Sequence, residues 1–275
     1  MRRRLAGTER GRQRDGGRIA LTNAGRWIAW LALACFVVLS GRVAQCADME
    51  LPGTWAELKV LSDSATFPLV GGLGRTTTLV QRLTVVQTGA SLMIQSTYCA
   101  ADFDNGPALT TTTDPAFIRS LAPVTVEASL DPTATPTRFA QSWSTELHGV
   151  RLDDPEREPL PTSASDSRVF DQDGDGKPGI TVHARALGAI TGDVYIVERL
   201  RTRLEGEVVS PDRIEGRVEG TVEQVILGAT NALFLGSIVS RPDRVSAHSH
   251  FVLQRVDPAW TCQDILAHRS TLFGG

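Results

Sequence analysis

Three aspartates at alternate positions carry the strongest chemical signal in this chain. Asp171, Asp173 and Asp175 stand in the stretch FDQDGDGKPGI, and Gly176 follows the third. In an EF-hand-type loop, side-chain oxygens at positions 1, 3 and 5 converge on calcium, and a glycine at position 6 makes a sharp turn. The backbone carbonyl of Lys177 would be the ligand from position 7. We therefore expect these three carboxylates and the Lys177 carbonyl to bind calcium.

The second half of this loop departs from the EF-hand pattern. Position 12, which should carry a bidentate carboxylate, is Val182, and position 9 is Gly179. Calcium takes six to eight oxygens, so water or a distant acid such as Asp166 or Asp193 would have to complete the shell. The alternative is a solvated acidic turn, because aspartate and glycine both favour turns and exposure weakens the repulsion between carboxylates.

Other motifs for chemistry are weak. His248 and His250 alternate along an expected strand and His183 follows the acidic loop, so the three could hold zinc, although exposed strand histidines are commoner. The sequence has no nucleophile elbow, H-E-x-x-H motif, P-loop or dinucleotide fingerprint. We therefore expect a protein that is not an enzyme. A hydrolase is the less favoured alternative, and it would need a cleft with convergent acids or histidines of perturbed pKa.

Residues 1–46 are expected to be a signal peptide. Residues 1–26 are rich in arginine, and residues 27–40 form an apolar run that is shorter than the roughly 20 residues a bilayer span needs. A basic n-region before a short apolar h-region is typical of bacterial export to the periplasm, cell envelope or medium. The alternatives are a retained membrane anchor and a lipid anchor on Cys46, although Gln45 departs from the small residue that a lipoprotein box requires.

Export would leave an acidic protein with one pair of cysteines. Residues 1–46 contain nine arginines and two acids, so 19 basic and 29 acidic residues remain, a net charge of about −10. Such a surface repels phosphate backbones, which excludes nucleic acid as a partner. Cys35 and Cys46 lie in the N-terminal segment. We expect Cys99 and Cys262 to form a disulfide in an oxidising compartment, the alternative being two buried thiols.

Residues 47–275 predict a single all-β domain. Apolar and polar residues alternate with period two in several segments, which places successive side chains on opposite faces of a sheet. We expect one antiparallel β-barrel, or a β-sandwich, of about 8–10 strands, with a short helix within residues 258–270. A transmembrane barrel is not expected, because the faces opposite the apolar ones carry arginine and glutamate.

The segment 197–225 predicts its own strand register. If Val208 lies opposite Ile214, apolar residues meet across the hairpin and three pairs of opposite charge form in the same register. Those charge pairs are Glu205–Arg217, Arg203–Glu219 and Arg199–Glu223. A slip of one residue would place every side chain on the wrong face. Glycines at positions 206, 216 and 220 interrupt the apolar face, which indicates either a tight bend or space for an enclosed molecule.

The segment 137–150 predicts a further strand. Alternation places Phe139, Trp143 and Leu147 on one face. Arg138, Glu146 and His148 would then lie on the other face. Polar connectors rich in proline and threonine separate the predicted strands, and we interpret them as loops within one domain.

The early G-x-W, Gly53-Thr54-Trp55, and a disulfide from an early strand to the C-terminal tail resemble a lipocalin-type barrel. The resemblance implies that Trp55 closes the barrel floor and that the interior binds a small apolar ligand. The later motif of that family is not evident. We expect an exported, non-enzymatic binding protein of unknown oligomeric state, or alternatively a structural or envelope-interaction module with a filled core. An apolar cavity above about 300 Å³ would favour the first.

Overall fold

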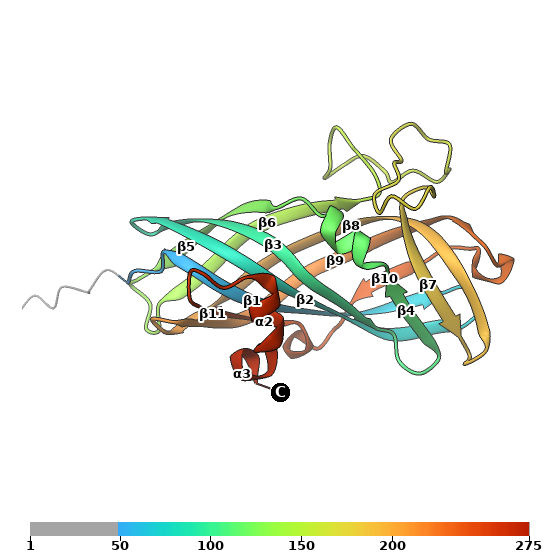
Figure 1. Ribbon diagram of the computed structural model, residues 1–275. Coiled ribbons are helices and arrows are strands. Elements are labelled where there is room, and N and C mark those ends of the chain that lie inside the picture. Colours follow the sequence, from blue (N-terminus) through green and yellow to red (C-terminus); the bar gives the residue numbers. More distant parts are fainter. Residues whose placement is uncertain (1–48, 275) are drawn as a thin grey trace, which may run out of the picture. The chain divides into compact units, whose positions relative to one another are not determined.

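The computed structural model describes residues 49–274, where eleven strands form one antiparallel sheet that closes into a ring (Figure 1). This confirms the predicted all-β fold. The predicted signal peptide and the cysteines at positions 35 and 46 lie outside the described residues. The strands are β1 (Gly53–Phe67), β2 (Gly71–Thr88), β3 (Ser91–Asp104), β4 (Leu109–Thr113), β5 (Val124–Asp131), β6 (Arg138–His148), β7 (Ile180–Ala186), β8 (Ile190–Ser210), β9 (Arg213–Ala229), β10 (Val239–Pro242) and β11 (His250–Arg255).

Several long strands pair with two shorter strands along one edge. The first part of β8 pairs with β7, and its remainder pairs with β6. In the same way β3 pairs with β5 and β4, and β1 pairs with β11 and β10. At each of three positions in the ring, two shorter strands thus lie end to end along one long strand. The sheet therefore has eleven strands rather than the predicted 8–10.

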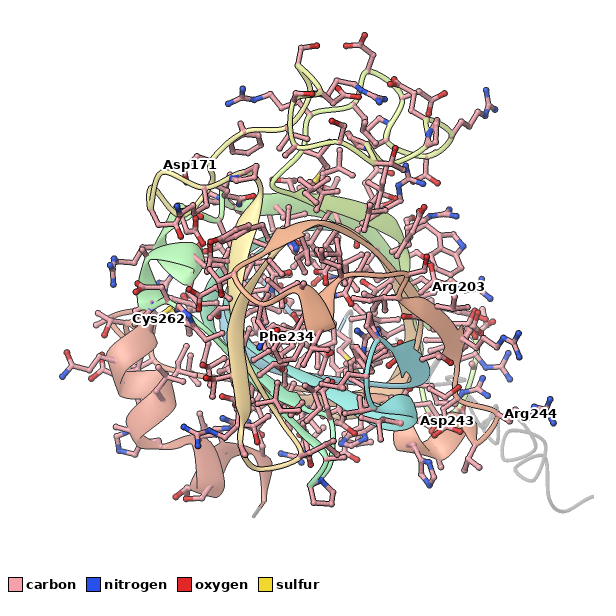
Figure 2. The ribbon with its side chains drawn as sticks, turned by 90° about the vertical axis from the view of Figure 1, so that its right-hand side faces the viewer. Asp171, Arg203, Phe234, Asp243, Arg244 and Cys262 are labelled. Carbon is pink, nitrogen blue, oxygen red and sulfur yellow. A yellow bond between two sulfur atoms is a disulfide. The ribbon has the colours of Figure 1, made fainter. Side chains whose placement is uncertain are left out.

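The β8–β9 hairpin has the predicted register. Val208 lies opposite Ile214, and all three predicted charge pairs face each other. Leu204 is 0% exposed and its cross-strand partner Val218 is 4% exposed, so the apolar face of the hairpin faces the interior of the ring. Arg203 points away from the interior of the ring (Figure 2), and its Nη2 lies 2.7 Å from Glu219 Oε2.

Two glycines of this hairpin allow a close approach of the strands and leave no room for a guest beside them. Gly206 and Gly216 face each other across the two strands. A Cβ atom added to Gly216 would lie 2.4 Å from Cα of Gly206 and 2.7 Å from Cε1 of Phe251. Backbone and the Phe251 ring therefore occupy the space next to these glycines, and a larger side chain could not enter without moving a strand.

The predicted faces of β6 are wrong beyond its middle. A β-bulge shifts the pairing of β6 with β8 between residues 141 and 144, and one extra residue inverts the alternation of a strand. Phe139, which precedes the bulge, stays buried. Trp143 is 45% exposed, whereas Glu146 and His148 are only 8% and 6% exposed. The bulge thus turns an acid and a histidine into the interior.

Two short helices at the C-terminus fall within or beside the predicted helical segment. They are α2 (Cys262–Ala267), which begins with a capping box between Thr261 and Asp264, and α3 (Arg269–Phe273). Both lie outside the ring, and Ile265 of α2 is fully buried against it. The predicted disulfide is present and joins Cys262 to Cys99 of β3. Within residues 49–274, no helix has the length and hydropathy that a membrane span requires.

A third helix, α1 (Pro115–Ser120), was not predicted. It lies partly within a threonine-rich segment that we interpreted as a loop. Its N-cap is Asp114, whose side chain accepts a hydrogen bond from Ala116 N, and proline occupies the first helical turn. Phe117 of this helix is 3% exposed and points into the ring. A single helical turn therefore contributes an interior aromatic side chain.

The interior of the ring is filled in one half and hollow in the other. The filled half is a cluster of 20 buried apolar residues that includes Trp55, Phe139, Leu204 and Phe251. Trp55 Nε1 donates a hydrogen bond to Leu51 O, and the guanidinium of Arg255 lies 4.5 Å from the Trp55 ring centroid. A second apolar cluster occupies the other half, around β4, β7 and the start of β8, and it surrounds a cavity.

Candidate functional site: an interior cavity and an acidic loop

The cavity is apolar on its walls. Its volume is about 80 Å³, which is below the roughly 300 Å³ expected for a ligand-binding interior. Four phenylalanines line it, Phe67, Phe103, Phe117 and Phe234. Four isoleucines complete much of the wall, Ile180, Ile196, Ile226 and Ile238. The lining is therefore that of a site for a small apolar molecule, whereas the volume is smaller than that of usual ligand pockets.

Phe234 lies within the ring when the ring is viewed from the end formed by β7 and β10 (Figure 2). It belongs to the 3₁₀ turn η1 (Ala232–Phe234), which Asn231 caps by accepting a hydrogen bond from Leu233 N. Gly192 of β8 makes room for the Phe234 ring, since a Cβ atom at position 192 would lie 3.1 Å from it. A short capped turn thus holds an aromatic side chain against the cavity.

A polar floor bounds the cavity toward the middle of the ring. We define the polar floor as Arg75, Glu198 and Gln224, which all line the cavity. Arg75 is 4% exposed and binds Asp63 through two hydrogen bonds, from Nε at 2.8 Å and from Nη2 at 2.5 Å. Arg75 Nη1 donates to Gln224 Oε1 at 2.7 Å. The guanidinium is therefore held rigidly by a bidentate carboxylate and an amide.

Glu198 of the polar floor is paired with His148. Glu198 Oε1 lies 2.9 Å from His148 Nδ1, and Glu198 Oε2 accepts from Gln224 Nε2 at 2.5 Å. Burial opposes the imidazolium, but the hydrogen bond and charge of Glu198, with the charge of Glu146, raise the pKa of His148 above its usual value. Burial likewise opposes the carboxylate, but His148 and the charge of Arg75 lower the pKa of Glu198. The contact therefore favours the imidazolium of His148 and the carboxylate of Glu198 together.

Further polar side chains are buried deeper in the ring. Tyr98 donates a hydrogen bond to Glu146 Oε2 at 2.6 Å, and burial together with the Glu146 charge raises the pKa of Tyr98 well above its usual value. Glu57 Oε1 lies 3.7 Å from Lys59 Nζ and has no hydrogen-bond donor among the described residues. Burial, only partly offset by Lys59, raises the pKa of Glu57. The interior thus carries ionisable groups from several strands.

The His148–Glu198 pair predicts greatest stability at mildly acidic pH. A raised pKa of His148 contributes stability that is complete below its unfolded value, about 6.5, and is lost as the pH rises through the folded value. The lowered pKa of Glu198 contributes stability that is present above about 4.5 and is lost as the pH falls through the folded value. The free energy of unfolding should therefore be largest between about pH 4.5 and 6.5 and should decline toward pH 9.

Urea unfolding at a series of pH values measures this dependence. His148→Gln should weaken the decline above pH 6.5, and His250→Gln, at an exposed position, should leave it as in the wild type. The raised pKa of Glu57 lowers stability as the pH rises above about 4.5 in both proteins, whereas the raised pKa of Tyr98 has an effect only above about pH 10. An identical pH profile in His148→Gln and the wild type would show that the pair does not titrate as assigned.

The three aspartates of the acidic loop converge as predicted. One oxygen from each of Asp171, Asp173 and Asp175 lies within 4.8 Å of the others. Asp171 accepts from the backbone N–H groups of Gly174 and Gly176, each at 2.8 Å. Asp173 Oδ1 is buried and has no hydrogen-bond donor among the described residues. Burial and the neighbouring carboxylates raise the pKa of Asp173. The arrangement could hold a metal ion.

The acidic loop is fixed to the strands that line the cavity. Gly149 and Gly179 both have positive φ, +71° and +83°, and the two backbones are in contact. A Cβ atom on Gly179 would lie 2.2 Å from Ile196 O, so only glycine fits beside β8 at this point. Asp171 lies on this loop outside the ring (Figure 2), whereas Ile180 immediately after it lines the cavity.

The distant acids proposed as further ligands have other partners. Asp166 binds Arg168 at 2.8 Å, and this hydrogen bond lowers the pKa of Asp166 to about 2. Asp193 lies 2.7 Å from His183 Nδ1. Val182, at loop position 12, lines the cavity instead of facing the aspartates. The ion shell would therefore have to be completed by water and backbone oxygens.

The histidines predicted as a zinc site do not come together. His183 binds Asp193, and His248 binds Asp243 at 2.7 Å. Within residues 49–274, the aspartate triad is the only group of three or more histidine, cysteine or acidic side chains with metal-ligand spacing. His148, which sequence reasoning placed on the outer part of a strand, is the histidine that faces the interior.

Comparisons of the chain with protein-family models, with curated protein sequences and with solved structures returned no match. The structure thus shows an all-antiparallel β protein whose sheet closes into a ring and which carries an acidic Asp171–Asp173–Asp175 cluster. The Cys99–Cys262 disulfide indicates an oxidising, extracytoplasmic location, because such bonds are rare in reducing compartments.

Proposed function

We propose that this protein is an exported, non-enzymatic binding protein that holds a small, largely apolar molecule in its interior cavity. One observation carries the proposal: half of the ring is filled with apolar side chains, and the other half contains a partly open cavity walled by phenylalanine and isoleucine. The apolar wall suits a guest no larger than one aromatic ring, and such a guest would have to widen the cavity of about 80 Å³ as it enters. The same arrangement is what the lipocalin-type resemblance implies, with Trp55 buried in the filled half.

Toluene is the simplest probe of this cavity. It should raise the melting temperature of the wild type and bind measurably by calorimetry, because it transfers apolar surface from water into a preformed apolar site. Ala184→Leu should weaken toluene binding at least tenfold, because Ala184 is buried on the cavity wall and leucine would fill the space. Arg185→Leu, on the exposed face of the same strand, is the matched control.

Two outcomes would count against the cavity as a binding site. Toluene could fail to bind the wild type, or it could bind Ala184→Leu as tightly as it binds the wild type. Circular dichroism and urea unfolding of both variants would show that each retains the fold. Failure of every small apolar probe would favour the alternative function, a structural or envelope-interaction module, which the filled half of the interior supports.

The paired state of the interior charges supports binding rather than catalysis. Convergent acids and a histidine with perturbed pKa values do face the interior, which is the arrangement that a hydrolase would need. However, Asp63 is held by Arg75, and Glu198 is held by both His148 and Gln224. Bases engaged in this way are already stabilised in their charged form, so they are poorly suited to accept a proton from a guest.

Export is part of the proposal. The basic and apolar segments of residues 1–40 and the Cys99–Cys262 disulfide support it. The net charge of about −10 after removal of residues 1–46 argues against nucleic acid as a partner. A lipid anchor on Cys46 is the alternative mode of localisation, and that residue lies outside the described part of the chain.

We further propose that the aspartate triad binds calcium. Support comes from the three converging carboxylates. It also comes from the buried Asp173 Oδ1, which has no hydrogen-bond donor among the described residues and which a bound cation would compensate. An exported protein meets millimolar calcium, which suits a site with few protein ligands. Its role would be to rigidify the loop that precedes β7, whose first residue lines the cavity.

Calcium is expected to stabilise the wild type and not a variant of the triad. At a calcium concentration ten times the dissociation constant, the gain in unfolding free energy should be about 1.4 kcal/mol. Asp173→Asn should abolish this gain, because it removes a charge at an unchanged volume. Asp153→Asn, an exposed position in the preceding loop, is the control. Thermal unfolding with and without a chelator measures the effect, and equal gains in Asp173→Asn and the wild type would contradict the site.

A further inference from the structure

The polar floor has hydrogen-bonding capacity that the protein does not use. A guanidinium has five N–H bonds, and four of those of Arg75 donate to Asp63, Gln224 and Ser240. One N–H at Arg75 Nη1 therefore has no acceptor among the described residues. Gln224 Nε2 donates one of its two N–H bonds to Glu198, and the other has no acceptor among the described residues. The floor thus offers donors to a guest.

Other polar groups at the cavity are partly compensated. Asn105 Nδ2 donates to Thr111 Oγ1 at 2.7 Å, and both residues line the cavity. Gln224 Oε1 accepts from Arg75, and both oxygens of Glu198 are engaged. The unused donors on Arg75 and Gln224 therefore make an acceptor atom, such as a hydroxyl or carbonyl oxygen, the best complement from a guest.

The charges around the floor are also balanced. Arg75 is neutralised by Asp63 at 2.5 Å, and Glu198 is held by His148 at 2.9 Å and by Gln224. A charged guest would bring an additional charge into a buried, apolar site where no described side chain is left to pair with it, and unpaired buried charges are strongly unfavourable. A carboxylate would also approach Glu198, and an ammonium would approach Arg75. The floor therefore discriminates against both signs.

We propose that the ligand is a neutral amphipathic molecule, with an apolar body about the size of an aromatic ring and one acceptor oxygen that meets Arg75 and Gln224. This inference rests on the proposed function, since it assigns the class of molecule that the cavity binds. The apolar body lies between the phenylalanines and isoleucines of the wall, and the oxygen points toward the middle of the ring. A second cavity continues beyond the floor, because Arg75, Glu198 and Gln224 line both spaces.

Four probes of matched size test the assignment on the wild-type protein at pH 7. They are toluene, benzyl alcohol, benzoate and benzylammonium. Benzyl alcohol should bind about three- to tenfold more tightly than toluene, the gain of one net hydrogen bond. Benzoate and benzylammonium should bind at least tenfold more weakly than benzyl alcohol. Calorimetry or competition against bound toluene provides the dissociation constants.

A variant of the floor provides a second measurement. Gln224→Met removes the two amide N–H donors and also the oxygen that accepts from Arg75 Nη1, while keeping a side chain of similar length, so it should change the advantage of benzyl alcohol over toluene and retain toluene binding. Thr221→Met, on the exposed face of the same strand, is the control and should keep the wild-type order. If Gln224→Met does not fold, the four-probe series on the wild type alone tests the assignment of the ligand.

The results separate this inference from the proposed function. If none of the four probes binds, the cavity is not a binding site and the proposed function fails. If toluene binds as tightly as benzyl alcohol, or if benzoate or benzylammonium binds best, the cavity is a binding site but the assignment of a neutral acceptor-bearing ligand is overturned. Tighter binding of benzyl alcohol than of the other three probes supports both the proposed function and the assignment of a neutral ligand with an acceptor oxygen.

Discussion

Replacing Cys99 and Cys262 with serine together is expected to lower the free energy of unfolding by about 3–5 kcal/mol. The bond joins residues 163 positions apart, so it closes most of the described chain into one loop. In the chain-entropy description, the unfolded state regains the freedom that this loop removes. The bond also holds α2, whose Ile265 is fully buried against the outside of the ring. Urea unfolding of the double variant measures the loss.

The wild type under reducing conditions is the matched control for this variant. Dithiothreitol should lower the stability of the wild type toward that of the double variant, and it should leave the double variant unchanged. The segment around α2 has other attachments, such as the hydrogen bond from Arg82 Nε to Trp260 O at 2.7 Å. If the double variant is as stable as the oxidised wild type, these attachments suffice and the disulfide contributes nothing to the fold.

Replacing Arg75 with methionine is expected to lower the free energy of unfolding by about 3–5 kcal/mol. The substitution would leave the carboxylate of Asp63 buried without its bidentate partner, and a buried charge that loses its partner is strongly destabilising. Adding Asp63→Asn to Arg75→Met removes the orphaned charge, so the double variant should recover most of the loss. Urea unfolding of the three proteins at pH 7 provides the comparison.

An ion pair on the outside of the ring is the control for this prediction. Arg203 and Glu219 are 2.7 Å apart but partly solvated, and exposed pairs contribute less than about 1 kcal/mol. Arg203→Met should therefore have a small effect. A double variant of Asp63 and Arg75 that is no more stable than Arg75→Met would mean that the packing of the arginine side chain, and not its charge, supports the interior.

The sequence predicted most reliably where apolar and charged patterns agreed. In the β8–β9 hairpin, the position of Val208 opposite Ile214 satisfied both the apolar face and three charge pairs, and the structure has that register. The cysteine pairing followed from the location of only two cysteines after the N-terminal segment. Both predictions rested on constraints with one consistent solution, which is why they were confirmed.

The complete polar floor could not be predicted, because Arg75 comes from a strand far away in sequence, although Glu198 and Gln224 lie opposite each other in the predicted register of the β8–β9 hairpin. The strand that contains Arg75 is separated by more than a hundred residues from the strands of Glu198 and Gln224. A partial signal is present in β1, where Glu57 and Asp63 share the face of Trp55 by alternation and so should be buried. Buried acids on an apolar face indicate an internal polar network, and this pattern was not used.

Local irregularities account for the other errors. The bulge in β6 turns Glu146 and His148 inward. The composition of the segment does not reveal the bulge, because apolar and polar residues alternate in it without a visible break. The single turns that carry Phe117 and Phe234 are too short to have a helical periodicity. Both turns contribute walls of the cavity, so the hollow half of the ring was beyond sequence reasoning even though a cavity was expected.

Methyl NMR of protein labelled at the isoleucine δ1 carbons tests the central claim most directly, because the cavity has an isoleucine wall. Addition of benzyl alcohol should shift the methyl signals of Ile180, Ile196, Ile226 and Ile238. The signals of Ile94 and Ile214, which lie in the filled half, should stay in place. Saturable shifts confined to the four wall residues are the expected result. Unchanged spectra, or shifts centred on Ile94 and Ile214, would contradict ligand binding in this cavity.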